Sequence, residues 1–312
     1  MNHRNEPSDA LYRDINIMST AIGTVTPNDP SYPQEPDLPL IGMPTAWGTT
    51  TGSRAVLVGD VDTGVNMGVG DLAPNIWTNP GESGTDAQGR SKATNGVDDD
   101  GDGYVDDVHG WNVAYNTNDP SDDYGHGSHV GGTIAARGDD GFGIAGVTWS
   151  STLIPVKVLS SSGSGYDTWI AQGMAYAAAR GARVVNLSLG GQGWSQAVAD
   201  VMAAYPGTLF VVAAGNSAMN VDQSGFFPCN AHAANELCVA ATDNADALAS
   251  FSNYGPTLVD LAAPGVNTLS WWNGSLRTAS GTSMATPHVA GAAALLLAAN
   301  PSLTTAQLRA AI

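Results

Sequence analysis

The sequence predicts an α/β fold of three layers, in which a mostly parallel central sheet lies between helices on both faces. Short apolar, β-branched runs alternate along the chain with longer alanine-rich runs, and this alternation is typical of such sheets. The short runs are apolar almost throughout, so both of their faces should be buried. The 312 residues include 38 Gly and few charged side chains, which suits one large compact unit.

Five strands and five helices are expected along the chain. The strands cover residues 55–61, 152–159, 182–187, 208–213 and 237–240. The helices cover residues 126–137, 166–180, 195–205, 283–300 and 304–311. Residues 27–44 are rich in proline and are expected to be irregular. Because parallel strands place ligand sites at their carboxyl ends, functional side chains are expected just after the strands.

The charge balance narrows the classes of partner. Asp and Glu number 29 against 11 Lys and Arg, giving a formal net charge of −18. A surface this acidic argues against nucleic acid or an anionic membrane as partner and favours bound cations. No apolar run is expected to span a bilayer, and residues 289–299 are interpreted as a core helix.

The two cysteines, Cys229 and Cys238, are nine residues apart. An even, minimal number favours one small disulfide. Two free thiols remain the alternative at this stage. Neither cysteine has a neighbouring histidine motif, so a catalytic role is not expected.

Polar residues with complementary chemistry follow the predicted strands. Asp62 ends the first strand, and Asn216 follows the fourth. His126 stands among small residues at the start of a helix, and Ser283 lies at the turn that opens another. A serine hydroxyl becomes a nucleophile when a histidine takes its proton and a carboxylate orients that histidine. The simpler alternatives are a helix-capping serine and a packed core histidine.

These residues stand in the motifs Asp-Thr-Gly, His-Gly-Ser-His, Ser-Leu-Gly, Ala-Ala-Gly-Asn and Gly-Thr-Ser-Met-Ala, in that order. From about residue 27 to residue 312 the chain resembles the subtilisin family of serine endopeptidases, nearest its thermitase-like branch. The resemblance implies a subtilisin-like fold with Asp62, His126 and Ser283 as a catalytic triad. It also implies that Asn216 and the backbone N–H of Ser283 stabilise the oxyanion.

The resemblance further implies two chain segments that pair with the substrate backbone. They are formed by Ser188, Leu189 and Gly190 and by Ser162, Gly163 and Ser164. The specificity pocket should lie between the first of these segments and Ala213, Ala214 and Gly215. Small residues on both walls predict a broad apolar slot, with a preference for large uncharged side chains.

The densest acidic segment predicts a calcium site. Asp98, Asp100 and Asp102 alternate ahead of a glycine and Tyr104, as in the first half of an EF-hand loop. The twelfth position is His109 rather than Glu, so the segment is not an EF-hand. Asp106 and Asp107 are expected to supply further oxygens. A solvated acidic loop is the alternative.

The resemblance implies a second calcium site that joins three segments. Its ligands are expected to be the side chains of Asp29, Asp71 and Asp140 and the carbonyl groups of Arg137, Phe142 and Ile144. A weaker third site is expected around Asn112, Asp119 and Asp122. These ions would be structural, since the triad chemistry needs no metal.

Asp60 departs from the family pattern, which has an apolar residue at this place in the first strand. Side chains alternate along a strand, so Asp60 should share a face with Asp62. A buried carboxylate is costly unless it is paired. Lys157 on the second strand is the predicted partner, and a protonated Asp60 is the alternative.

The sequence thus predicts a calcium-stabilised serine endopeptidase that acts as a secreted monomer on protein or peptide substrates. Residues 1–28 are expected to be an N-terminal extension or a remnant, too short for the family's propeptide, and residues 29–312 the catalytic domain. The chain ends before the family's last strand and helix, so a shortened C-terminal packing is expected. The alternatives are an impaired subtilase that only binds peptides and an acyl-transferase or ligase on the same site.

Overall fold

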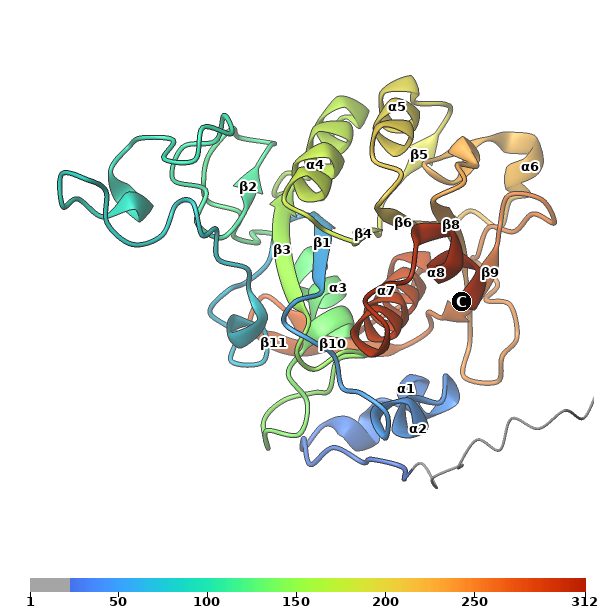
Figure 1. The fold of residues 1–312 in the computed structure, drawn as a ribbon. Coiled ribbons are helices and arrows are strands. Elements are labelled where there is room, and N and C mark those ends of the chain that lie inside the picture. Colours follow the sequence, from blue (N-terminus) through green and yellow to red (C-terminus); the bar gives the residue numbers. More distant parts are fainter. Residues whose placement is uncertain (1–22) are drawn as a thin grey trace, which may run out of the picture.

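The computed structural model describes residues 23–312, so most of the N-terminal extension predicted at residues 1–28 lies outside the described part. A seven-stranded sheet forms the centre, with the strand order β2-β3-β1-β4-β6-β8-β9 and parallel pairing throughout (Figure 1). Its strands are β1 Leu57–Asp62, β2 Trp111–Asn112, β3 Thr152–Lys157, β4 Val184–Leu187, β6 Leu209–Ala213, β8 Glu236–Thr242 and β9 Leu261–Pro264. The predicted α/β class is confirmed.

Helices cover both faces of this sheet (Figure 1). On one face lie α3 (His126–Ala135) and α7 (Thr282–Ala299), and on the other lie α4 (Asp167–Ala179) and α5 (Gln196–Ala204). The shorter helices are α1 Asp37–Leu40, α2 Met43–Trp47, α6 Val221–Ser224 and α8 Thr305–Ala311. Short 3₁₀ turns cover Tyr32–Gln34, Ala73–Asn75, Lys92–Thr94 and Cys229–Ala231.

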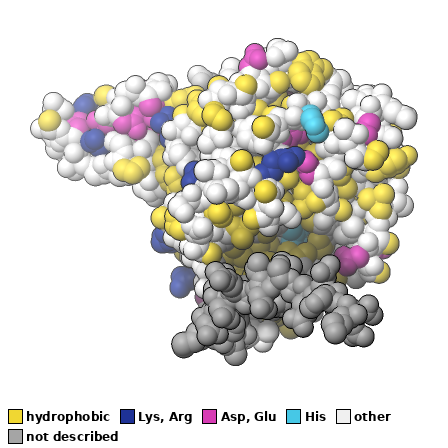
Figure 2. All heavy atoms as spheres, turned by 45° about the vertical axis from the view of Figure 1, so that its right-hand side comes forward, with side chains coloured by type: hydrophobic (Ala, Val, Ile, Leu, Met, Phe, Trp, Pro, Cys, Tyr) yellow, Lys and Arg dark blue, Asp and Glu magenta, His cyan; other side chains and the backbone are white. Residues whose placement is uncertain are grey.

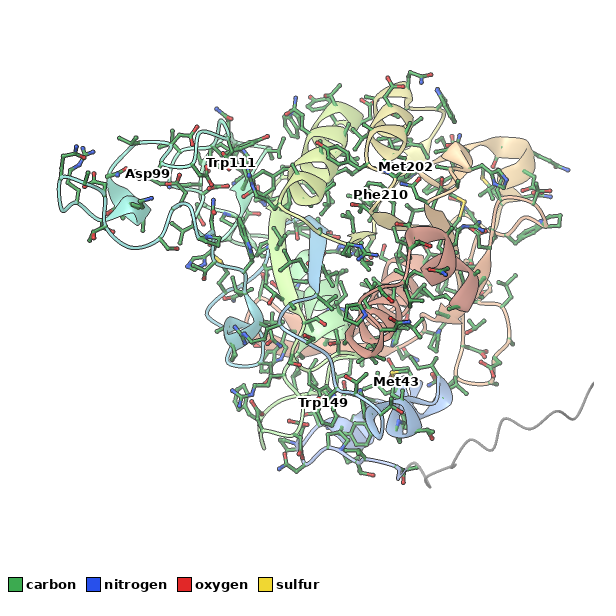
Figure 3. All side chains as sticks on the ribbon, in the orientation of Figure 1. Met43, Asp99, Trp111, Trp149, Met202 and Phe210 are labelled. Atoms are coloured by element: carbon green, nitrogen blue, oxygen red, sulfur yellow. A yellow bond between two sulfur atoms is a disulfide. The ribbon has the colours of Figure 1, made fainter. Side chains whose placement is uncertain are left out.

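Each face of the sheet carries its own apolar core. Ile134 and Val289 belong to the core under α3 and α7. Met202 and Phe210 belong to the opposite core and lie between α5 and β6 in Figure 3. A third, smaller cluster that includes Trp149 packs the short helices α1 and α2 onto the body. The almost continuous apolar character of the strands is therefore explained by burial on both sides.

Several short elements were not expected from the sequence. Residues 27–44, predicted to be irregular, contain α1 and the start of α2. The strands β2 and β9 and two small antiparallel pairs were also missed. The pairs are β10 (Thr268–Trp272) with β11 (Ser275–Ala279) and β5 (Gly191–Gln192) with β7 (Phe226–Phe227). These elements are only a few residues long, so no hydrophobic period can be seen in them.

Helix α7 requires a correction to the expectation about membrane spans. By length and composition its 18 residues could cross a bilayer, with a mean hydropathy of 1.3. However, 72% of the helix is buried inside the molecule. Burial of this extent is typical of a core helix, as predicted for residues 289–299.

The two cysteines form the disulfide Cys229–Cys238. Of the two alternatives, the structure therefore shows the bonded form. Both residues are fully buried, and the bond joins strand β8 to the 3₁₀ turn that follows β7.

Candidate active site

The predicted carboxylate and imidazole lie together at the carboxyl end of β1. Asp62 is the last residue of this strand, and His126 is the first residue of α3. The Nδ1 atom of His126 lies 2.7 Å from Oδ1 of Asp62. Gly127 makes this approach possible, because a Cβ there would lie 2.1 Å from the carbonyl oxygen of Gly64. The backbone N–H of Thr63 also donates to Oδ1 of Asp62, at 2.7 Å.

The electrostatic setting of His126 makes its imidazole a stronger base. Burial works against the imidazolium, but attraction to Asp62 and their hydrogen bond outweigh it and raise the pKa of His126. His129 has the opposite setting. Burial lowers the pKa of His129 to about 4, and its Nε2 donates to two backbone carbonyl groups. This neutral, packed histidine therefore has a structural role.

Ser283 lies in the first turn of α7, one residue after the helix begins at Thr282. Its hydroxyl donates to the carbonyl oxygen of Ser188 at 2.9 Å. Pro287 lacks an N–H and so cannot donate to the Ser283 carbonyl as an ordinary helical residue would. The hydroxyl of Ser188 donates to that carbonyl instead, at 2.8 Å. Ser188 and Ser283 thereby fix each other's position.

Asn216 follows β6 and faces the same region. Its Oδ1 accepts hydrogen bonds from the backbone N–H and the hydroxyl of Thr282, at 2.8 and 3.0 Å. Both bonds are made to the amide oxygen, so neither of them uses the Nδ2 donor. The first-turn N–H of Ser283 has no acceptor within its own helix. Two donors are therefore available beside the serine hydroxyl.

These residues line one cleft of about 400 Å³. His126, Asn216 and Ser283 contribute to it, as do most of the predicted substrate-binding residues, namely Ser188, Leu189, Gly190, Gly163, Ser164, Ala213 and Gly215. Ser162 instead lines a smaller neighbouring hollow with Trp169. Ala214 is buried in the strand end, where its N–H and C=O bond to Val239 and Asn253. The sequence missed Gly165, Ile170, Phe226 and Phe227, which also line the cleft.

Asp60 has no partner at the site, and the predicted pairing with Lys157 is wrong. Both carboxyl oxygens of Asp60 are buried and have no hydrogen-bond partner among residues 23–312. In the β1–β3 register Asp60 lies opposite Pro155, whereas Lys157 lies opposite Asp62. The Nζ atom of Lys157 reaches past the strand end to the carbonyl oxygen of Thr63 and to Asp123, at 2.7 and 2.5 Å.

An unpaired, fully buried Asp60 is expected to be protonated. Burial raises its pKa well above the usual value, and the charges of Asp62 and Asp122 act in the same direction. The folded chain therefore holds a proton that the unfolded chain releases above about pH 4. As the pH rises towards the folded-state pKa, the free energy of unfolding falls by about 1.4 kcal/mol per pH unit.

We therefore expect Asp60→Val to be more stable than the parent, by a margin that grows from about pH 5 to about pH 8. Thermal midpoints across this range measure the margin, in a Ser283→Ala background that prevents self-digestion. Glu35 and Glu236, whose pKa values burial raises to about 9 and about 8, contribute equally to both proteins. The exposed change Asp200→Asn is the control and should leave the margin near zero. A margin that is constant with pH would contradict a protonated Asp60.

The predicted acidic loop brings carboxylates together on a segment that projects from the body. The projection returns to the body at β2 (Figure 1), and Figure 2 shows acidic side chains gathered on it. Figure 3 places Asp99 on it and Trp111 at its base. Two overlapping groups have oxygens within 4.8 Å of one another. One group is Glu82, Asp98 and Asp100, and the other is Asp100, Asp102 and Asp107.

The composition of these groups suits calcium, which prefers oxygen ligands. Glu82 is fully buried, and its Oε2 has no partner among the described residues. Arg180 pairs with Asp102 and lies 3.7 Å from Asp107, so one positive charge faces several carboxylates. Glu82 was missed because it lies 16 residues before Asp98 in the chain.

Of the other ligands expected for the acidic loop, Asp106 has a different partner, while the carbonyl group of Tyr104 stays a prediction. Asp106 lies outside both groups, because its carboxylate accepts from the N–H of Gly96 at 3.1 and 3.2 Å. The side chain of Tyr104 packs edge-on against Trp111 and Tyr176. Asp107 and Glu82, rather than Asp106, thus complete the two carboxylate groups.

The three segments of the second predicted calcium site lie close together. Asp29 accepts from the N–H groups of Asp139 and Asp140, at 2.7 and 3.4 Å. Oδ2 of Asp71 accepts from the N–H of Ile144 and from Trp271, while its Oδ1 is buried without a partner. Burial raises the pKa of Asp71 to about 6, with the charges of Asp140 and Asp29 adding to it.

The remaining predicted residues of this site lie in the same loop. The backbone N–H of Arg137 donates to the carbonyl oxygen of Asp71 at 2.9 Å. The ring of Phe142 stacks on Trp271, and its N–H donates to Asp140 at 3.0 Å. The unpartnered oxygen of Asp71 is the feature here that fits a bound cation.

A third calcium site was predicted around Asn112, Asp119 and Asp122. In the structure these side chains form hydrogen bonds with protein groups instead. Asp122 accepts from the N–H groups of Tyr124, Gly125 and Ser128 and from the hydroxyl groups of Thr63 and Ser128. It therefore organises the start of α3. Asn112 and Asp119 bond within their own loop. These bonds argue against a cation site at this place.

A serine that lines the same cleft as a histidine–aspartate pair, at the carboxyl edge of a parallel sheet, is the arrangement of a serine hydrolase. The chain belongs to the Subtilase family, whose model matches residues 53–312. It is 37% identical over 297 residues to thermitase of Thermoactinomyces vulgaris, covering 92% of this chain and 90% of that protein. It is 47% identical over 191 residues to Subtilisin Savinase of Lederbergia lenta, covering 60% of this chain and 68% of that protein.

The solved structures agree with this membership. A cold adapted subtilisin-like serine proteinase matches with a TM-score of 0.64 and 34% identity, covering 82% of this chain and 80% of that one. The predicted resemblance is therefore confirmed. The chain is an enzyme, a serine endopeptidase of the Subtilase family.

Proposed function

We propose that the chain hydrolyses internal peptide bonds through an acyl-enzyme on Ser283, with His126 as the base and Asp62 as its orienting carboxylate. The observation that carries this proposal is the 2.7 Å contact between His126 Nδ1 and Asp62. The contact fixes the imidazole at the cleft that Ser283 and Asn216 also line.

The reaction would proceed in two halves. In the first, the Ser283 hydroxyl turns from the Ser188 carbonyl towards Nε2 of His126, which takes its proton as the oxygen attacks the peptide carbonyl. His126 then gives this proton to the departing amine, and the acyl-enzyme remains. In the second half, His126 takes a proton from water as the water attacks the ester, and then gives this proton to the Ser283 oxygen as the acid is released.

Asn216 and the N–H of Ser283 would stabilise the oxyanion in both halves. The corresponding asparagine of subtilisin, a relative of this chain, contributes about 3–4 kcal/mol to transition-state stabilisation. The N–H and the hydroxyl of Thr282 donate to Oδ1 of Asn216 and so hold the amide in position, with Nδ2 left to donate to the substrate. The donor is thereby oriented before the substrate arrives.

Calcium is proposed as a structural ion in two places. The acidic projection would hold one ion through Glu82, Asp98, Asp100, Asp102 and Asp107. The second would be held by Asp71 with Asp29 and Asp140. The bound ions would neutralise carboxylates that otherwise repel one another. We further propose that the enzyme is secreted and acts as a monomer on proteins and peptides, as the resemblance implies.

The test of this function is the hydrolysis of a peptide that is blocked at both ends. Cleavage at an internal bond is the expected result, and an activated ester substrate should give a burst of the first product equal to the enzyme concentration. Binding of the peptide without cleavage would favour the peptide-binding alternative. Adding an amine acceptor separates the other alternative, since a ligase would give mainly the coupled product and a hydrolase mainly the free acid.

A further inference from the structure

The side chain of Phe226 occupies the slot that the sequence predicted to be open. Phe226 belongs to the short strand β7, which pairs with β5 at the rim of the cleft. A Cβ built on Gly190 would lie 2.6 Å from Cε1 of the Phe226 ring. A Cβ built on Gly215 would lie 2.7 Å from Cζ of the same ring. The ring edge therefore touches both walls of the slot.

This contact changes the interpretation of Gly190 and Gly215. Because both residues lack a side chain, the sequence predicted a broad pocket between them. In the structure, the Phe226 ring takes part of the space that the missing side chains leave at both glycines. The rest is taken by the carbonyl oxygen of Phe227, 2.4 Å from a Cβ built on Gly190, and by Nδ2 of Asn253, 2.4 Å from a Cβ built on Gly215. The small residues on both sides of the slot thus leave room for the Phe226 ring, and this ring limits the depth of the slot.

The ring is held in place by its backbone. On one side of Phe226, the carbonyl oxygen of Gly225 accepts from Gly193 at 3.4 Å. On the other side, Cys229 is bonded to Cys238 in the central sheet. Asn230 also donates to the carbonyl of Gly193, at 2.7 Å. The strand that carries Phe226 is tied at both ends, so the ring cannot leave the slot by a simple movement of the loop.

We propose that Phe226 is a specificity-determining residue that restricts this enzyme to small side chains, such as alanine or serine, before the scissile bond. The proposal replaces the expected preference for large uncharged side chains. It rests on the proposed function, because it takes the slot between Gly190 and Gly215 as the place where that side chain binds. Larger side chains would have to displace the ring from its contacts with both walls.

The experiment compares two chromogenic peptides, succinyl-Ala-Ala-Pro-Ala-p-nitroanilide and succinyl-Ala-Ala-Pro-Phe-p-nitroanilide. We expect the parent to have a higher kcat/KM for the alanine peptide. In Phe226→Gly the ratio should shift by about 100-fold towards the phenylalanine peptide, since filling a vacated apolar pocket has an effect of this order. Phe226→Leu should give an intermediate ratio. Each ratio is measured on one preparation, so partial loss of folded enzyme cancels.

Phe251→Leu is the matched control, because Phe251 is a partly buried phenylalanine outside the cleft. Its ratio should equal that of the parent. A parent that prefers the phenylalanine peptide would overturn the proposal, and so would an unchanged ratio in Phe226→Leu. If the parent hydrolyses neither peptide, the proposed function itself fails, and this result is distinct from an inverted preference. The ratio of the parent decides the matter even if Phe226→Gly does not fold.

Discussion

Replacing Ser283 by alanine should lower kcat by about 10⁶-fold while leaving the fold intact, a magnitude measured for the same change in subtilisin, a relative of this chain. The hydroxyl is the proposed nucleophile, and alanine retains the helical position in the first turn of α7. The residual rate would come from the oxyanion donors alone. Initial rates on a chromogenic peptide, with circular dichroism to verify folding, provide the measurement.

Ser280→Ala is the matched control for this prediction. Ser280 is exposed and lies three residues before the nucleophile. Its hydroxyl only accepts from the backbone N–H of Asn267, at 2.9 Å. We expect kcat within about twofold of the parent, as for an ordinary surface change. Substantial activity in Ser283→Ala would refute the assignment of the nucleophile.

Removing calcium should lower the thermal midpoint by about 4 °C for each site. An ion present at about 100 times its Kd stabilises the folded state by about 2.7 kcal/mol. For a chain of this size, each kcal/mol shifts the midpoint by about 1.5 °C. The carboxylates of the acidic projection add to the loss, because they repel one another without the ion. Thermal unfolding of Ser283→Ala with and without chelator is the measurement.

Glu82→Gln separates the two sites, because it alters only the projection. Its Oε1 can still accept from the N–H of Asp99, as Glu82 does at 2.7 Å. We expect the chelator to shift its midpoint by about half as much as in the parent. Asp99→Asn is the control within the same loop, since Asp99 lies outside both carboxylate groups and accepts from Asn95. A midpoint that is unaffected by chelator in the parent would exclude both structural ions.

The fold and the catalytic residues could be predicted because their signals are local. The strands that carry Asp62 and Asn216 are continuous apolar runs, and such runs are buried whatever surrounds them. The carboxyl ends of parallel strands meet at one edge of the sheet, so the polar residues after them were expected to converge. The structure places His126 beside Asp62 accordingly.

The predictions that were wrong or incomplete depended on register and on contacts between distant segments. Pairing Asp60 with Lys157 required the register between β1 and β3, and no local pattern encodes it. Glu82 joins the carboxylate cluster only through the folding of the whole projection. Phe226 comes from a two-residue strand, and nothing near it in the sequence indicates that its ring reaches Gly190 and Gly215.

Covalent labelling with a fluorophosphonate tests the central claim most directly, because this reagent reacts with a serine that an adjacent base has activated. Mass spectrometry of the intact protein and of its peptides would identify the modified residue. The account predicts one label per chain, located on Ser283 and absent from His126→Ala. A label on another residue, or full peptide hydrolysis by a chain that takes up no label, would contradict it.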